Sequence, residues 1–275
     1  MADFFILMWK PLLACLILTG IHTYLGLHVI ERKVIFIDLA LAQIAALGTV
    51  VAFLFGFGLH SGPTYWFALS ATFLGALVFS LTRAKKERIP QEAIIGIVYA
   101  VSAALAVLVL HQVAEGDEEI RNMLVGNILL VELGEIIKMA ALYGLVGLFH
   151  WRFWKTFILI STKPEQALKE GVSIKWWDIL FYSAFGIVVT SSVQIAGVLL
   201  VFSFLIIPAV GAMIFCERLS SRLIFGWVFG MFASFLGIAI SYYGDLPTGA
   251  AVVCTFGALL GILGVAKTLW YTSGK

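Results

Sequence analysis

Two histidines, one aspartate and one glutamine lie within the first two strongly apolar stretches of the sequence: His22, His28, Asp38 and Gln43. An ionisable side chain inside a membrane is costly unless it is paired or faces water, so each of the four is a candidate for function. Imidazole and carboxylate groups bind zinc, manganese and iron, whereas a neutral amide is a weak ligand that more often forms hydrogen bonds. The four residues predict either a transient metal site or buried hydrogen bonds.

The depth of these side chains follows from a hairpin that turns at residues 31–33. With a rise of about 1.5 Å per residue, positions equally far from the turn lie at the same depth, which pairs His28 with Asp38 and His22 with Gln43. The first pair lies near the membrane edge, where a structural ion pair or hydrogen bond is the alternative to metal binding. The second pair lies about 12 Å deep and predicts transient coordination or an interhelical hydrogen bond.

Four further polar residues, within or beside the apolar stretches, are candidates for function. Glu92 opens the fourth apolar stretch near the basic residues 83–88, which favours a surface ion pair. Asn127 and Gln194 either line a pathway or pair with backbone carbonyl groups, and Asp245 lies in a loop expected outside the cell.

The composition indicates the elements that carry these side chains. Hydrophobic residues make up 61% of the 275 residues and charged residues only 12%, whereas a soluble domain has about a quarter charged residues. The net charge of +2 gives no support for a nucleic-acid partner. The three cysteines lie in apolar stretches without metal-finger spacing, so neither a disulfide nor a metal role is expected. The sequence predicts an all-α polytopic protein in a lipid bilayer.

About 20 apolar residues are needed to cross the hydrocarbon region as a helix, and nine stretches approach this length. The sixth and seventh form one continuous run, so eight spans are the alternative. Basic loops favour the cytoplasmic side, which places the N-terminus outside and the C-terminus in the cytoplasm. There is no phosphate-binding glycine–lysine loop, so any ATPase must be a separate subunit. The predicted spans are 11–30, 34–55, 64–81, 93–110, 133–151, 177–196, 198–215, 223–243 and 249–270.

A short polar helix is predicted near residues 162–171, between the fifth and sixth spans. Thr162 and Glu165 have the spacing of a capping box, and Gly171 can supply the left-handed residue that ends the helix. Its length would be about 12 Å. The segment is either a solvated loop helix or a docking helix for a motor subunit.

Five sequence segments, taken together and in order, resemble the permease subunits of bacterial ATP-binding-cassette (ABC) importers for zinc, manganese and iron. The resemblance extends from about residue 20 to the C-terminus. The segments are Phe36-Ile37-Asp38-Leu39-Ala40-Leu41-Ala42-Gln43 with Gly48, then 92–98, 125–131, 196–209 and 241–250.

The resemblance implies one transmembrane permease domain over residues 1–275, with an architecture similar to that of siderophore and vitamin B12 permeases. It implies a homodimer in the bacterial cytoplasmic (inner) membrane, a cytoplasmic ABC ATPase dimer and an extracytoplasmic metal-binding protein. The chain would be a non-catalytic transport subunit with no permanently bound cofactor, moving a divalent metal while ATP binds the partner. The family's coupling helix corresponds to the segment near 162–171, with the candidate contact residues Pro164, Glu165, Ala167, Leu168 and Gly171.

The second span departs from the family pattern. Family members typically carry an Asp and a His four residues apart, and the corresponding residues here are Leu39 and Gln43. Asp38 is displaced by one position, about 100° around the helix. We hypothesise that His22 and His28 compensate. The alternatives are a permease for an iron–siderophore or other metal chelate, an ATP-independent secondary carrier, and an integral-membrane enzyme.

Overall fold

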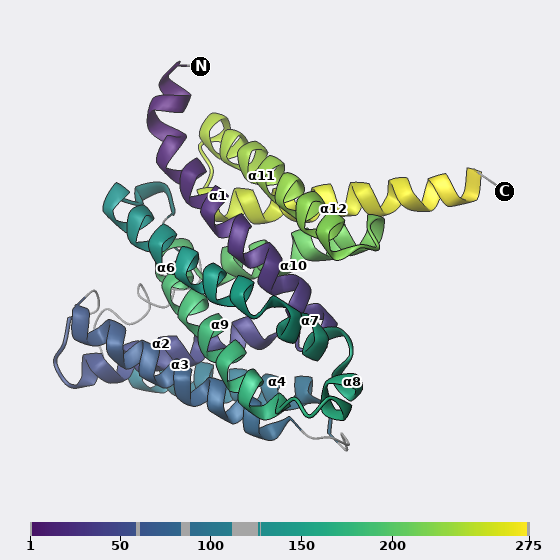
Figure 1. Ribbon diagram of the computed structural model, residues 1–275. Helices are drawn as coiled ribbons and strands as arrows, with labels where there is room; N and C mark the ends of the chain where they lie inside the picture. The colour runs from purple at the N-terminus through teal and green to yellow at the C-terminus, as the bar shows by residue number, and fades with distance from the viewer. Residues whose placement is uncertain (1, 59–60, 84–88, 112–125, 127, 274–275) are drawn as a thin grey trace. The chain divides into compact units, whose positions relative to one another are not determined.

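The computed structural model describes residues 2–58, 61–83, 89–111, 126 and 128–273, and the regular structure in these ranges is helical throughout (Figure 1). Nine of the described helices are long and apolar enough to cross a membrane. The prediction of an all-α polytopic membrane protein is confirmed. The elements are α1 (Ala2–Glu31), α2 (Ile37–Leu54), α3 (Gly62–Thr82), α4 (Gln91–Leu110), η1 (Ile128–Leu130), α6 (Leu133–Arg152), α7 (Trp154–Thr162), α8 (Pro164–Lys169), α9 (Ile174–Ala196), α10 (Val198–Phe215), α11 (Leu219–Gly244) and α12 (Thr248–Ser273).

The start of α1 differs from the predicted span, and the break between α9 and α10 decides between eight and nine spans. Helix α1 begins at Ala2 rather than at residue 11, and Pro11 lies inside it. Proline removes one backbone hydrogen bond, but the apolar residues before it continue the helix. At 30 residues α1 is about 45 Å long, which exceeds the hydrocarbon thickness. Helices α9 and α10 are separated by Gly197 at φ +76°, so the long apolar run forms two spans rather than one.

The chain divides into two compact units. The first unit comprises Met1–Leu27, Val125–Ala140 and Ile195–Lys275. The second unit comprises His28–Leu124 and Ala141–Gln194. Helices α1, α6 and α9 each contribute residues to both units.

Glycines allow close helix contacts in the first unit. A Cβ atom added at Gly26 in α1 would lie 1.9 Å from the carbonyl oxygen of Leu205 in α10. At Gly230 in α11, an added Cβ would lie 2.6 Å from Cγ2 of Thr19. Helices in membranes associate through such small residues because lipid supplies little hydrophobic driving force between them.

The break between α9 and α10 is packed against another glycine of the first unit. Gly126 has φ +65°, and an added Cβ would lie 2.2 Å from the carbonyl carbon of Ala196. Both Gly126 and Gly197 adopt backbone conformations that residues with a side chain rarely tolerate. Position 126 therefore requires glycine for shape and for space, and position 197 requires it for shape.

The second unit combines glycine packing with buried hydrogen bonds between helices. An added Cβ at Gly48 in α2 would lie 2.8 Å from Cα of Ala68 in α3. The hydroxyl groups of Thr72 in α3 and Thr190 in α9 are 2.9 Å apart and buried. Such bonds satisfy polar groups that lipid cannot hydrate and fix the contact between α3 and α9.

Candidate transport pathway and coupling segment

Helix α2 presents one partly exposed stripe. Leu39, Gln43 and Leu47 are spaced by four residues and are all partly exposed, whereas the other residues from Ile37 to Val50 are buried. A spacing of four residues keeps side chains on one helix face. The two positions that the resemblance aligns with the metal pair therefore lie on the accessible face of α2.

Asp38 lies on the buried side of the same helix. It is 2% exposed, and its Oδ1 atom has no hydrogen-bond partner among the described residues. Asp38 occupies the first turn of α2, where the helix dipole stabilises a negative charge. The rotation of about 100° relative to Leu39 separates this carboxylate from the accessible stripe.

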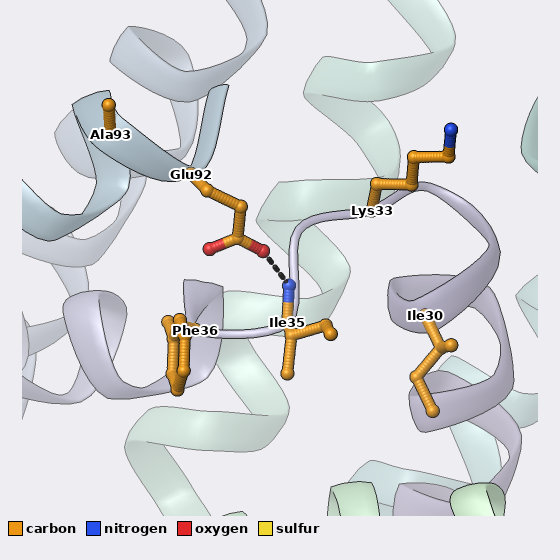
Figure 2. Close-up of a pocket in the computed structure, with 6 residues that line it drawn as sticks. All are labelled: Ile30, Lys33, Ile35, Phe36, Glu92 and Ala93. Atoms are coloured by element: carbon orange, nitrogen blue, oxygen red, sulfur yellow. Dashed lines mark hydrogen bonds between the residues drawn. The ribbon is translucent and has the colours of Figure 1, made fainter. Parts of the chain in front are cut away.

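Glu92 at the start of α4 binds the turn between α1 and α2. Its Oε1 atom accepts a hydrogen bond from the backbone N–H of Ile35, as Figure 2 shows. The carboxylate lines an open pocket of about 470 Å³ together with Ile30, Lys33, Ile35, Phe36 and Ala93. The predicted ion-pair partners at 84–88 lie outside the described residues, and Arg83 binds Asp178. The observed contact gives Glu92 a structural role in holding the turn.

His22 is fully buried in the first unit. Its Nδ1 atom lies 2.9 Å from the carbonyl oxygen of Leu18, so Nδ1 donates and any metal coordination would have to use Nε2. Gln43 belongs to the second unit. The predicted pairing of His22 with Gln43 stays a prediction.

His28 lies in a hydrogen-bonded and aromatic environment within the second unit. Its Nδ1 atom is 2.8 Å from Ser161 Oγ, and Arg32 Nε donates a 2.8 Å hydrogen bond to the same oxygen. Because Ser161 already accepts from Arg32, its single hydroxyl proton is available for His28 Nδ1. The rings of His150 and Phe181 lie 6.5 and 5.8 Å from the His28 ring. A neighbouring guanidinium disfavours a divalent cation here, so these contacts indicate a structural role.

A buried ion-pair cluster joins three segments of the second unit at Asp178. Arg32 Nη1 lies 2.6 Å from Asp178 Oδ1, and Arg83 Nη1 lies 2.7 Å from Asp178 Oδ2. The side chains of Arg32 and Asp178 are fully buried. On the sequence alone, Arg32 is a basic loop residue and Arg83 a loop residue near Glu92, and the cluster was missed. The available signal was Asp178, a carboxylate just inside the predicted sixth span.

The segment predicted as a coupling helix forms α8, but its cap differs from the prediction. The capping box is wrong, because the Thr162 hydroxyl donates to the carbonyl oxygen of Ile158 and no side chain caps α8. Thr162 is still the last residue of α7, which leaves Lys163 as the N-cap and Pro164 as the first residue of α8. With six residues α8 is about 9 Å long rather than 12 Å.

The far end of α8 matches the prediction. Gly171 has φ +75°, which confirms it as the left-handed residue that ends the segment. Ala167 is fully buried, whereas Glu165 and Leu168 are exposed. The segment thus has one anchored face and one accessible face.

Rings from α6, α7 and α9 pack around Phe157 and anchor the approach to α8. The ring of His150 stacks on Phe157 at 4.3 Å, and Trp177 and Phe181 lie 5.4 and 6.0 Å away. Aromatic pairs at these distances add stability beyond the burial of their area. Helix α7 is therefore firmly attached to both neighbouring spans.

The remaining candidates have separate locations. Asn127 lies outside the described residues, and Gln194 is exposed near the end of α9. Asp245 is exposed, adopts φ +52° and closes α11 through a backbone hydrogen bond to Ser241. Within the described ranges, no three His, Cys, Asp or Glu side chains come together in a way that could hold a metal ion.

Comparison with known proteins finds sequence relatives that are named as membrane proteins of metal transport systems, and a solved structure with the same fold. A Haemophilus influenzae protein named "Probable iron transport system membrane protein" is 26% identical over 248 residues, which cover 90% of this chain and 85% of the relative. The manganese transport system membrane protein MntC of Listeria monocytogenes is 29% identical over 192 residues, covering 66% of this chain and 67% of the relative. A chain of PsaBC from Streptococcus pneumoniae, solved in complex with Fab, has the same fold, with a TM-score of 0.79 at 22% identity and coverage of 95% and 94%.

The family assignment rests on the match to the ABC 3 transport family, which extends over residues 5–267. This range includes α2 with its accessible stripe, α8 and the cluster at Asp178. Nine apolar helices within the described residues agree with a multi-pass protein of the bacterial inner membrane. The chain belongs to the ABC 3 transport family.

Proposed function

We propose that this chain is the membrane-spanning permease subunit of an ABC importer that moves a divalent transition metal, either zinc, manganese or ferrous iron. The family match over residues 5–267 carries the proposal. The names of the relatives from Haemophilus influenzae and Listeria monocytogenes, which refer to iron and manganese transport, support the class of substrate. The permease itself performs no chemistry, and ATP is hydrolysed on a partner subunit.

The proposed assembly is a homodimer with a cytoplasmic ATPase dimer and an extracytoplasmic metal-binding protein. The N-terminus lies outside and the C-terminus in the cytoplasm, as the basic loops favour. ATP binding closes the ATPase dimer and changes the access of the pathway between the two sides of the membrane. Residues 162–171 then face the cytoplasm, where a motor subunit can reach them.

Helix α8 is the proposed docking element for the ATPase. Its exposed Glu165 and Leu168 offer a charged and an apolar contact, while buried Ala167 holds the segment to the permease. Pro164 is its first residue, and Gly171 follows its C-cap residue, Glu170. An element that is accessible on one side and anchored on the other can pass a movement from the motor to the membrane helices.

The accessible stripe of α2 is the proposed pathway surface. Gln43 supplies a polar oxygen on this stripe. His22, buried in the first unit, is a separate proposed pathway residue. The contacts of His28 with Ser161 and of Glu92 with Ile35 support structural roles for those residues. The other proposed pathway residues are Asp38, Asn127, Gln194 and Asp245.

The function can be tested with the permease co-purified with its ATPase and reconstituted with the loaded binding protein. We expect ATP hydrolysis and metal uptake to be stimulated by one of zinc, manganese or ferrous iron. His22→Ala should reduce uptake, whereas His111→Ala, at the end of α4, serves as a control that should leave uptake unchanged. An intact assembly that responds to none of the three metals would contradict the proposal.

Transport of a metal chelate is the second candidate, and the composition of the α2 stripe favours it. Leu39 and Gln43 replace the charged and imidazole ligands that a bare cation would use, whereas a chelate brings its own ligands. The same reconstituted assembly should then respond to an iron–siderophore complex and not to free metal. Uptake that continues without ATP would instead indicate a secondary carrier.

A further inference from the structure

Arg32, in the turn after α1, contacts the helix before α8 and the helix after it. Its Nε atom donates a 2.8 Å hydrogen bond to Ser161 Oγ in α7. Its Nη1 atom donates a 2.6 Å hydrogen bond to Asp178 Oδ1 in α9. One guanidinium group therefore connects both flanks of α8 to the end of α1, entirely within the second unit.

Burial makes these contacts difficult to separate. The side chains of Arg32 and Asp178 are both 0% exposed, and the guanidinium carbon lies 3.9 Å from the centre of the Phe181 ring. Removing one partner of a buried ion pair leaves an uncompensated charge away from water, which is strongly unfavourable. Exposed ion pairs, by contrast, contribute little and break easily. The connection is therefore expected to persist when the segment moves.

Asp178 extends the connection to α3. Arg83, at the C-terminal cap of α3, donates to Asp178 Oδ1 and Oδ2 at 2.9 and 2.7 Å. Nearby, the hydroxyl group of Ser80 donates a 2.9 Å hydrogen bond to the carbonyl oxygen of Lys175. The first turns of α9 are thus fixed to the end of α3 as well as to Arg32.

Backbone hydrogen bonds connect both ends of α8 closely to the neighbouring residues. The backbone N–H of Lys163 donates to Leu159 at 2.8 Å, which joins the start of α8 to α7. The backbone N–H of Val172 donates to Ala167 at 2.9 Å, which closes the far end of α8. A displacement of α8 must therefore move α7 and the residues that lead into α9.

We propose that Arg32 is the positioning residue through which movement of α8 reaches the end of α1. Its contacts with Ser161 and Asp178 make α7, α8 and the start of α9 move together with the end of α1, and Arg83 includes α3 in the same body. The inference rests on the proposed function in one respect, that α8 docks on an ATPase. It assigns coupling to a residue that contacts neither the cargo nor the ATPase-facing side of α8.

The first test measures metal uptake and ATP hydrolysis in the reconstituted assembly. Arg32→Met and Asp178→Asn should leave ATP hydrolysis largely intact while metal moved per ATP falls by about tenfold, within the range of a typical coupling between two sites. Arg32→Lys keeps a positive charge near Asp178, but a lysine amine cannot bind Asp178 and Ser161 at the same time as a guanidinium does. Its loss of metal moved per ATP should therefore lie between the wild type and Arg32→Met. Ser161→Ala should have a smaller effect, and Arg152→Met, which removes an exposed arginine of α6, is the matched control.

The second test measures rigidity and requires no metal. Spin labels at the exposed positions Lys33 and Glu165, with the native cysteines replaced, report the distance between the turn after α1 and α8. In the wild type the distribution of this distance should be narrow both with and without nucleotide. In Arg32→Met the distribution should broaden, while Arg152→Met should resemble the wild type.

The two tests separate failure of this inference from failure of the proposed function. An unchanged distance distribution in Arg32→Met overturns the inference, as does an unchanged ratio of metal moved to ATP hydrolysed. If Arg32→Met does not assemble, Arg32→Lys and Ser161→Ala decide in the same way. If no metal stimulates ATP hydrolysis or uptake by the wild-type assembly, the proposed function is refuted. The distance measurement still decides whether Arg32 joins these segments.

Discussion

Replacing Gly26 with alanine should destabilise the contact between α1 and α10. The added Cβ would lie 1.9 Å from the carbonyl oxygen of Leu205, whereas a relaxed contact between carbon and oxygen needs roughly 3.3 Å. The obstacle is backbone, so no side-chain rotation relieves it, and the helices must separate by more than about 1 Å. Overpacking of this kind costs about 1–3 kcal/mol, and we expect the upper part of that range. Alanine has a better helix propensity than glycine by about 1 kcal/mol, so the free energy of unfolding should fall by about 2 kcal/mol in total.

Gly20 provides a matched control in the same helix. An added Cβ at Gly20 has no neighbour within 4 Å, so Gly20→Ala should be neutral or slightly stabilising. Both variants can be unfolded in mixed detergent micelles by titration with sodium dodecyl sulfate, with tryptophan fluorescence as the signal. Equal stability of Gly26→Ala and the wild type would refute the close contact, and an equal loss in Gly20→Ala would show a general intolerance of α1 to alanine.

Three further substitutions test separate contacts in the same unfolding assay. Phe157→Ala should cost about 3–5 kcal/mol because it empties the centre of the aromatic cluster around α7; a loss below 1 kcal/mol would argue against that packing. Thr72→Val removes the hydroxyl bonded to Thr190 and should cost about 1 kcal/mol, with no loss expected if the bond is absent. Asp245→Gly should stabilise by up to about 1 kcal/mol, because glycine accepts φ +52° without strain, whereas Asp245→Ala should not.

The membrane spans could be predicted because their signal is local. Each span needs about 20 apolar residues in sequence, and no distant partner has to be known. The predicted first span, 11–30, lies within the longer helix α1, because apolar residues continue on both sides of Pro11. The break at Gly197 needed the structure, because an apolar run does not show whether a glycine inside it adopts a left-handed conformation.

The cluster at Asp178 could not be predicted because its partners are far apart in sequence. Arg32 and Arg83 are separated from Asp178 by 146 and 95 residues. Each arginine is also well explained by the preference of basic residues for cytoplasmic loops, so nothing marked them as buried. The capping box failed for a different reason: the spacing of Thr162 and Glu165 fits the motif, but Thr162 ends α7 and bonds backwards to Ile158.

If the accessible stripe of α2 is the pathway surface, as proposed above, it limits what the permease contributes to metal selection. Its three side chains are one amide, Gln43, between two leucines, so a passing cation meets few protein ligands and no charge on this surface. Conduction requires binding that is strong enough to admit the cargo and weak enough to release it. A surface of this kind favours release. Under the proposed function, discrimination among metals therefore has to come mainly from the external binding protein, while the permease supplies a path whose access is controlled through α8.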